Sequence, residues 1–315
     1  MVYISEQEKN AVRLKLKNHR PINAGEFKIL AQVRNEDLPP SVWHDILYRN
    51  SKTIAHGLPK RHKTNWLVTL TMAIASGTPI LNRDTIPSRV LYISAEQKEW
   101  ALEERCSAMM LPYNNIPHFY EQWQLLYLTT DIRTPQYIEK MVSEEKPELL
   151  VLDPLQQLII PENKQEVWDE WIKYFDYLCD SYNLTLILAH HSRKPEQKTK
   201  ENLNDMISNI RGFGKIGGWA NNIIGIVRTK PRTKDMISIG FECRDSKDSP
   251  EDITLNFNRD ACLFSEIIPR SDLIETYLIE NRDKYNTITE LVKMCAEEFD
   301  LSEVRIWQIR SELSL

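Results

Sequence analysis

The sequence predicts an α/β fold whose mostly parallel sheet is covered by helices on both faces and carries an antiparallel hairpin at one edge. Two observations support this expectation. Segments such as "PELLVLDPLQQLI" are near-continuous apolar runs, and they alternate along the chain with amphipathic segments such as "EVWDEWIKYFDYLCDSYN". A strand that is buried on both faces needs apolar side chains at nearly every position, which is typical of parallel sheets between helical layers.

The composition is that of a globular chain with a large core. The 315 residues exceed one average domain, and 42% of them are hydrophobic while 27% are charged. The formal net charge of −5 gives no general attraction to nucleic acid. The five cysteines lack metal-binding spacing, which is typical of thiols in a reducing compartment. No apolar run approaches the ~20 residues of a membrane-spanning helix, so we expect a cytoplasmic protein.

Residues 1–45 are predicted to form a helical arm. This segment mixes charged residues with sparse apolar ones and ends near Pro39 and Pro40, which stop a helix. The core, residues 46–268, then opens with a strand in "SKTIAHG", a loop at 57–64 and a helix whose apolar residues recur at helical spacing. Gly77 and Pro79 are expected to end that helix.

The remaining core segments continue the alternation of strands and helices. Further strands are predicted in "RVLYISAEQ", "QLLYLTTD", "PELLVLDPLQQLI" and "LTLILAHHSRK", with helices between them. Residues 200–218 are polar and contain glycine, which predicts a surface loop. The segment "NNIIGIVRTKPRTKD" returns to a strand, and the alternating pattern of residues 236–267 predicts the edge hairpin. Residues 269–315 are expected to form a small domain of three helices with a helix-turn-helix outline.

The loop "HGLPKRHKT" resembles a phosphate-binding loop with one substitution. The general pattern is Gly, four residues, then Gly-Lys-Ser/Thr, and the chain supplies Gly57, Lys63 and Thr64 with His62 in place of the second glycine. Backbone N–H groups at a helix N-terminus can hold phosphates, the Lys63 ammonium can reach them, and the Thr64 hydroxyl can bind Mg²⁺. Histidine tolerates a left-handed backbone better than most residues. A chance loop is the alternative interpretation.

Other polar residues follow the predicted strands at their carboxyl ends, where ligands of parallel sheets bind. Asp153 follows four apolar residues and is suited to organise the water shell of Mg²⁺. Glu96 is placed to polarise a water that attacks a terminal phosphate. His190 or His191 could sense that phosphate, although either could instead be a structural residue held by the backbone. Both acids could likewise be ordinary strand-end carboxylates.

The region from Arg193 to Lys234 carries ten basic and three acidic residues, which is a local basic patch in an acidic chain. Phosphate backbones are its natural partner, and a solvated surface run is the alternative. The residues that we expect to contact DNA are Arg193, Lys194, Lys198, Lys200 and Lys215.

Basic residues that follow the last parallel strand could reach a neighbouring subunit. Arg228, Lys230 and Arg232 are candidates for an arginine finger, which stabilises transition-state charge on a neighbour's nucleotide, or for a DNA contact. Residues 270–315 hold six basic and ten acidic side chains, so the terminal helices are at least as well suited to protein docking as to DNA.

Eight segments together resemble a known family more specifically than any one motif. They are "GLPKRHKTNWLVTLTMAIASGTPIL", "RVLYISAEQKEWALEERCSAM", "PELLVLDPL", "LILAHHSRK", "RGFGKIGGWANNIIGIVR" and the late "ISIGFECRDS", "ITLNFN" and "CLF". In this order they resemble the RecA-like AAA_25 or RepA-type ATPases of plasmids, phages and mobile elements, over about residues 46–268. The resemblance implies a RecA-like P-loop core that forms hexameric rings and couples ATP hydrolysis to movement on single-stranded DNA, usually in replication.

The resemblance also implies roles for matching residues. Lys63 and Thr64 match the phosphate loop, Glu96 the water-activating carboxylate, Asp153 the metal-organising acid, and His190 or His191 the sensor. The positions that would act on a neighbouring subunit are Arg211, Lys230 and Arg232. The chain departs from the family at His62, which stands with two basic residues in a loop that is usually small and rich in glycine.

Three hypotheses follow. The first is an ATP- and Mg²⁺-dependent, ring-forming DNA helicase or replication ATPase of a mobile genetic element, which contacts other replication proteins through its C-terminal helices. The second is a RecA-like adaptor or loader that binds DNA and recruits partners while its hydrolysis is weakened or lost at His62. The third, a small-molecule phosphotransferase, fits the basic patch poorly.

Overall fold

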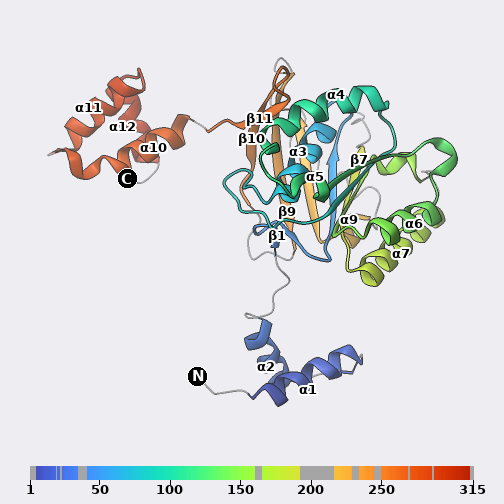
Figure 1. Cartoon of the computed structure of the whole chain (residues 1–315). Coiled ribbons are helices and arrows are strands. Elements are labelled where there is room, and N and C mark those ends of the chain that lie inside the picture. Colours follow the sequence, from blue (N-terminus) through green and yellow to red (C-terminus); the bar gives the residue numbers. More distant parts are fainter. Residues whose placement is uncertain are drawn as a thin grey trace.

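The structure is a computed structural model of the chain, shown in Figure 1. It describes residues 5–18, 20–21, 23–34, 41–159, 165–191, 216–228, 234–244, 250–268, 270–285 and 287–312. Across these ranges the dominant feature is one nine-stranded sheet with helices on both faces. The predicted fold class is therefore confirmed.

The strand order of the sheet is β11-β10-β9-β8-β3-β7-β6-β4-β5. Six strands run parallel, and β8 then pairs with β9 in the antiparallel sense, as do β9 with β10 and β10 with β11. The predicted antiparallel edge is thus confirmed, and it has three strands. The parallel strands are β3 (Lys52–Gly57), β4 (Val90–Ser94), β5 (Trp123–Tyr127), β6 (Leu149–Asp153), β7 (Thr185–His191) and β8 (Asn222–Arg228). The edge strands are β9 (Met236–Cys243), β10 (Ile253–Asn258) and β11 (Leu263–Glu266).

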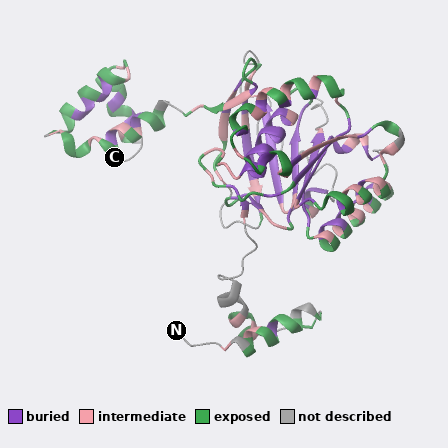
Figure 2. Cartoon of the chain, viewed as in Figure 1, coloured by how far each residue is buried: buried purple, intermediate pink, exposed green. Residues whose placement is uncertain are grey.

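Side chains alternate between two apolar cores, one on each face of the sheet. On β4, Tyr92 belongs to the core that includes α3 (Lys63–Ser76), α4 (Glu99–Met110) and α5 (Phe119–Gln122). Its neighbour Ile93 belongs to the core that includes α6 (Pro135–Glu145), α7 (Gln165–Tyr182) and α9 (Ile216–Trp219). Figure 2 shows the strands buried between these layers. The near-continuous apolar strands of the sequence are explained by this double burial.

Two local features differ from the sequence-based expectation. Strands β1 (Ser41–Trp43) and β2 (Leu47–Tyr48) form a small antiparallel ribbon, and Trp43 is fully buried in the core beside α3. Val42 and Trp43 therefore belong to the core, although the sequence predicts a helical arm for the segment that contains them. Strands of two or three residues are too short to show a period of two, so the sequence does not reveal them. Ile216–Trp219 is a helical turn, although 200–218 was expected to be a loop. The rest of that loop lies outside the described residues.

Both ends of the chain are helical, as predicted. Helices α1 (Glu6–Lys17) and α2 (Ala24–Arg34) form the N-terminal pair. Helices α10 (Arg270–Glu280), α11 (Ile288–Glu298) and α12 (Glu303–Glu312) share their own apolar cluster, centred on Ile274, Val292 and Ile306. The domain boundaries drawn from the sequence stay a prediction. Short 3₁₀ turns occur at Leu111–Tyr113, Thr130–Ile132, Leu155–Gln157 and Arg282–Lys284. None of the helices among the described residues has the length and apolarity to cross a membrane.

Candidate functional site

The loop between β3 and α3 bends where the motif requires it. A Cβ atom added at Gly57 would lie 2.6 Å from the backbone oxygen of Ile226 on β8, so only glycine fits beside that strand. His62 has φ of 56° and occupies the N-cap of α3, and Lys60 has φ of 63°. Both are left-handed conformations, for which glycine is the default. His62 therefore adopts the backbone of the glycine that it replaces.

The N-terminus of α3 offers its N–H groups to a ligand. The first turn of a helix has four N–H groups without partners in the helix, and they favour an anion. No side chain caps this helix, and its first turn has no acidic residue. The helix begins with Lys63 and Thr64, and it starts at the carboxyl end of the central strand β3. The arrangement is that of a phosphate-binding helix N-terminus.

Lys63 is buried below the loop. Its Nζ lies 2.8 Å from the backbone oxygen of Gly57, 3.3 Å from that of Leu58 and 2.6 Å from Nδ1 of His191. Burial lowers the pKa of the ammonium to about 8, and the carboxylates of Asp153 and Glu96 oppose this decrease. The charged form still predominates at neutral pH, so the site holds a cation that a phosphate group can attract away from these contacts.

His191 connects Lys63 to Glu96. The ammonium can only donate, so Nδ1 of His191 accepts, and Nε2 then carries the hydrogen toward Oε2 of Glu96 at 3.2 Å. The Glu96 side chain is 53% exposed, and it lies two residues after the end of β4 instead of within the strand. The described site therefore holds an exposed carboxylate in contact with a half-buried imidazole.

His190 does not share this position. Successive strand residues point to opposite faces, and the His190 ring packs beside His56 and Trp168 on the α7 side of the sheet. Burial lowers the pKa values of His190 and His56 to about 3. Of the two sensor candidates, the structure brings only His191 to the loop.

Asp153 lies in the next strand, held by a tyrosine. Tyr92 Oη donates to Oδ2 of Asp153 at 2.6 Å, and both side chains are buried. Burial and this carboxylate raise the pKa of Tyr92 well above its usual value, so the phenol stays protonated and donates. Ser94 pairs in register with Asp153 across β4 and β6, and its buried Oγ has no hydrogen-bond partner among the described residues.

These residues form a row at the carboxyl ends of adjacent strands. The order β3-β7-β6-β4 places the phosphate loop, His191, Asp153 and Ser94 side by side, all facing α3. No group of three His, Cys, Asp or Glu side chains within the described ranges could hold a metal ion by itself. Mg²⁺ in nucleotide sites takes most ligands from phosphates and water. The Thr64 hydroxyl, the Asp153 carboxylate and the unsatisfied Ser94 hydroxyl fit such an ion and its water shell.

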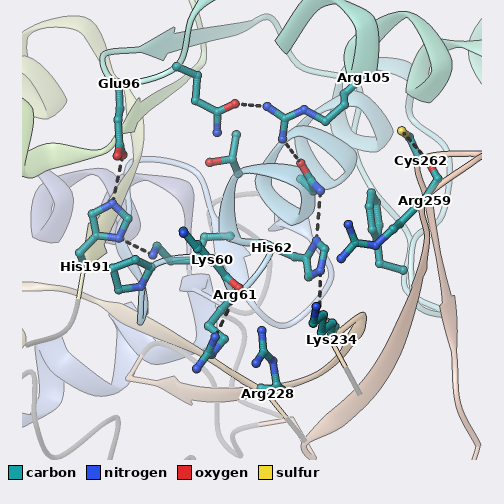
Figure 3. A pocket seen from close by; sticks show the side chains of 16 residues that line it. Lys60, Arg61, His62, Glu96, Arg105, His191, Arg228, Lys234, Arg259 and Cys262 are labelled. Atoms are coloured by element: carbon teal, nitrogen blue, oxygen red, sulfur yellow. Dashed lines mark hydrogen bonds and ion pairs between the residues drawn. The ribbon is translucent and has the colours of Figure 1, made fainter. Parts of the chain in front are cut away.

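A cavity of about 880 Å³ opens over the loop (Figure 3). Among the described residues, seven of those that line the cavity are lysine or arginine, whereas Glu96 is the one acidic side chain. This excess of positive charge suits a polyphosphate anion. Asp153, Ser94 and Gly57 are not among the lining residues. The lining residues are Pro59, Lys60, Arg61, His62, Lys63, Thr64, Asn65, Glu96, Gln97, Arg105, His191, Arg228, Lys234, Phe257, Arg259 and Cys262.

The cavity contains residues that sequence reasoning missed. Arg105 from α4 and Arg259 from the turn after β10 line the same side of the cavity, and Glu96 and His191 lie on the other side (Figure 3). An isolated arginine in a helix or turn carries no motif, so no sequence signal identified either. Arg228, considered above as a trans-acting finger, lines the cavity of its own chain. The other finger and DNA-contact candidates lie outside the described residues: Arg193, Lys194, Lys198, Lys200, Arg211, Lys215, Lys230 and Arg232.

The parallel order of the sheet, the loop and the strand-end acids define a RecA-like P-loop ATPase. The chain belongs to the AAA_25 family, an AAA domain, which matches residues 27–197. The fold is similar to that of the ATPase domain of G40P, with a TM-score of 0.56 and 11% identity over 79% of this chain and 100% of that one. It is also similar to the KaiC-like protein PH0186 of Pyrococcus horikoshii OT3, with a TM-score of 0.51 and 10% identity over 72% of this chain and 94% of that one. No curated protein matches the sequence.

Proposed function

We propose that this chain binds ATP with Mg²⁺ in the cavity over the β3–α3 loop and hydrolyses it while acting on single-stranded DNA. The observation that carries the proposal is the set of seven basic side chains around the uncapped start of α3, with Glu96 as the one acid that the described part of the chain adds to the lining. A helix N-terminus with a buried lysine and an open polar cavity favours the binding of a polyphosphate. The family to which the chain belongs supports the same assignment.

Each residue of the site has a role in this proposal. Lys63 neutralises the phosphates, and Glu96 orients the attacking water, while His191 responds to loss of the terminal phosphate. The contact between His191 and Glu96 allows such a response, because a change at the imidazole alters the position of the carboxylate. When bound through Thr64 and the waters beside Asp153, Mg²⁺ would supply charge neutralisation between the phosphates.

The proposed DNA binding and ring assembly rest on features of the sequence, most of which lie outside the described residues. The ten basic residues between Arg193 and Lys234 are a sequence feature that suits a phosphate backbone. An arginine finger from Arg211, Lys230 or Arg232 would require a neighbouring subunit, and a hexameric ring would supply one. A ring of this kind in the replication of a mobile element is the function that we infer, with the C-terminal helices as a docking module for other replication proteins.

The second candidate is an adaptor or loader that binds nucleotide and DNA but turns over slowly. The observation that favours it is the state of Lys63, whose ammonium is bonded to the carbonyl of Gly57 and to His191. A ligand phosphate must break these contacts before the lysine can act. Slow turnover would then follow from the chain's own hydrogen bonds.

The test compares ATP hydrolysis by the full chain with and without single-stranded DNA, alongside Lys63→Ala and Glu96→Gln. If the chain is an ATPase that acts on single-stranded DNA, we expect DNA-stimulated turnover that falls at least a hundredfold in both variants, with nucleotide binding retained in Glu96→Gln. The adaptor predicts nucleotide and DNA binding without multiple turnover in the parent chain. Full activity in Lys63→Ala would contradict the assignment of the site. Mass photometry with and without ATP measures whether a ring forms.

A further inference from the structure

We propose that His62 is a positioning residue that fixes the phosphate loop to the antiparallel strands β9, β10 and β11, the edge sheet. The loop then holds its ligand-binding shape before a nucleotide binds. In this view the histidine is not a tolerated defect in a glycine motif. Restoring the glycine should loosen the loop and weaken nucleotide binding. The inference rests on the proposed nucleotide site.

The His62 ring is held on both of its nitrogen atoms. Nε2 lies 3.2 Å from the backbone oxygen of Lys234 and 3.4 Å from Oδ1 of Asp235, both just before β9. Nδ1 lies 3.2 Å from the side-chain nitrogen of Asn65, which donates to it. Arg259 Nη2 lies 2.7 Å from the same Oδ1 of Asp235. The ring therefore joins the loop, the start of β9 and the turn after β10.

The flat face of the ring is also engaged. The centroid of His62 lies 4.7 Å from that of Phe257 on β10 and 6.3 Å from that of Phe264 on β11. The side chain is only 12% exposed. Because both nitrogens and one face already have protein partners, the ring has little left to offer a phosphate. Its contacts therefore serve the position of the loop.

The same contacts continue from Asn65 to Arg105 on α4. Arg105 Nη1 donates to Oδ1 of Asn65 at 2.6 Å, and a second nitrogen of that arginine bonds to Gln97 in the connection after β4 (Figure 3). Asn65 thus links Arg105 to His62. The loop is therefore held by α4 through Asn65 and by the edge sheet through the side chain of His62. The backbone of His62 is itself left-handed.

The edge sheet does not depend on His62 for its own position. Trp66, one turn further along α3, packs edge-on against Phe264 with a centroid distance of 5.7 Å. Phe257 and Phe264 also belong to the apolar core on the α3 face. Removing the imidazole should therefore leave the sheet folded and release only the loop, which makes the glycine variant a usable test.

The experiment compares the parent chain with His62→Gly and with Asn50→Gly as a matched control. Asn50 is another left-handed residue, with φ of 57°, but its exposed side chain lies in the turn before β3 and away from the cavity. Hydrogen exchange of residues 57–66 is measured in the nucleotide-free protein, ADP affinity by calorimetry, and KM and kcat by ATP turnover. We expect several-fold faster exchange in His62→Gly, an ADP Kd raised about tenfold and a raised KM with little change in kcat, whereas Asn50→Gly matches the parent.

Unchanged exchange together with equal or tighter ADP binding in His62→Gly would overturn the proposal. Hydrogen exchange is measured without any nucleotide, so it tests whether His62 holds the loop in place even if the parent chain fails to bind ADP. In that case the assignment of a nucleotide site fails, while faster exchange in His62→Gly would still support His62 as the pin of the loop.

Discussion

Nζ of Lys63 lies 2.6 Å from Nδ1 of His191, and the far nitrogen of the same ring lies 3.2 Å from Glu96. One imidazole therefore contacts both the cation that would hold the phosphates and the acid that would orient the attacking water. A phosphate that draws Lys63 toward itself frees one side of His191. The phosphate and His191 thus compete for the ammonium of Lys63. Because only the charged form attracts a phosphate, nucleotide affinity should report whether Lys63 is protonated.

Nucleotide affinity is expected to decrease above pH 8. Burial lowers the pKa of Lys63 to about 8, so the ammonium is charged below that pH and must take up a proton on binding above it. The ADP Kd should rise by up to about tenfold per pH unit between pH 8 and the pKa of the bound state. Calorimetry from pH 7 to 9.5 measures this. In Lys63→Arg the guanidinium stays charged, so the ADP affinity of this variant should not decrease above pH 8. If the ADP Kd rises equally with pH in both proteins, the prediction is contradicted.

Tyr92→Phe should raise the Mg²⁺ concentration that ATP turnover requires. The variant removes the hydrogen bond to Asp153, a loss of about 1.5–3 kcal/mol for a bond to a charged partner, and leaves the carboxylate free to turn. The Mg²⁺ concentration for half-maximal ATP turnover should rise several-fold, and thermal unfolding should occur at a lower temperature. Tyr120→Phe, which removes an exposed hydroxyl contact with Asn114, is the control. An unaltered Mg²⁺ response in Tyr92→Phe would show that the tyrosine does not position the acid.

Gly57→Ala should destabilise the chain. The new methyl group would meet a backbone oxygen at 2.6 Å, and backbone cannot swing aside as a flexible side chain can. Overpacking of this kind costs about 1–3 kcal/mol. Thermal unfolding of the full chain measures the loss. Gly218→Ala is the matched control, since nothing lies within 4 Å of a Cβ there. Equal unfolding temperatures for the two variants would refute the close-packing argument.

Stability should fall with acidification below about pH 6.5. The pKa values of His56 and His190 are lowered to about 3 in the folded chain, whereas an unfolded histidine titrates near 6.5. The unfolded state therefore binds more protons between these values, and the contribution of the neutral rings is fully present above 6.5. The loss is at most about 1.4 kcal/mol per pH unit for each ring. Unfolding temperatures from pH 8 to 5 test this. His190→Leu should show a shallower slope, and an unchanged slope would contradict it.

Much of the fold could be predicted because its signals are local. Each apolar run and each amphipathic segment reports burial within about ten residues, so the strand and helix order followed directly. The loop from Gly57 to Thr64 could be found for the same reason. The β1–β2 ribbon could not, since its strands are too short for a pattern. The separation of His190 from His191 follows from strand alternation, but only the packing of α3 shows which face carries the site.

The sequence by itself determined the α/β class and the antiparallel edge, and it predicted a site that contains Lys63, Thr64, Glu96 and one of two adjacent histidines. Only the tertiary structure decided that Tyr92 holds Asp153, that Arg105 and Arg259 face one cavity, and that His62 is bound to Lys234 and Phe257. These contacts join segments up to about two hundred residues apart. Periodicity and spacing describe neighbours along the chain, whereas such contacts are set by the order of the strands in the sheet and by the packing of α3 against its edge.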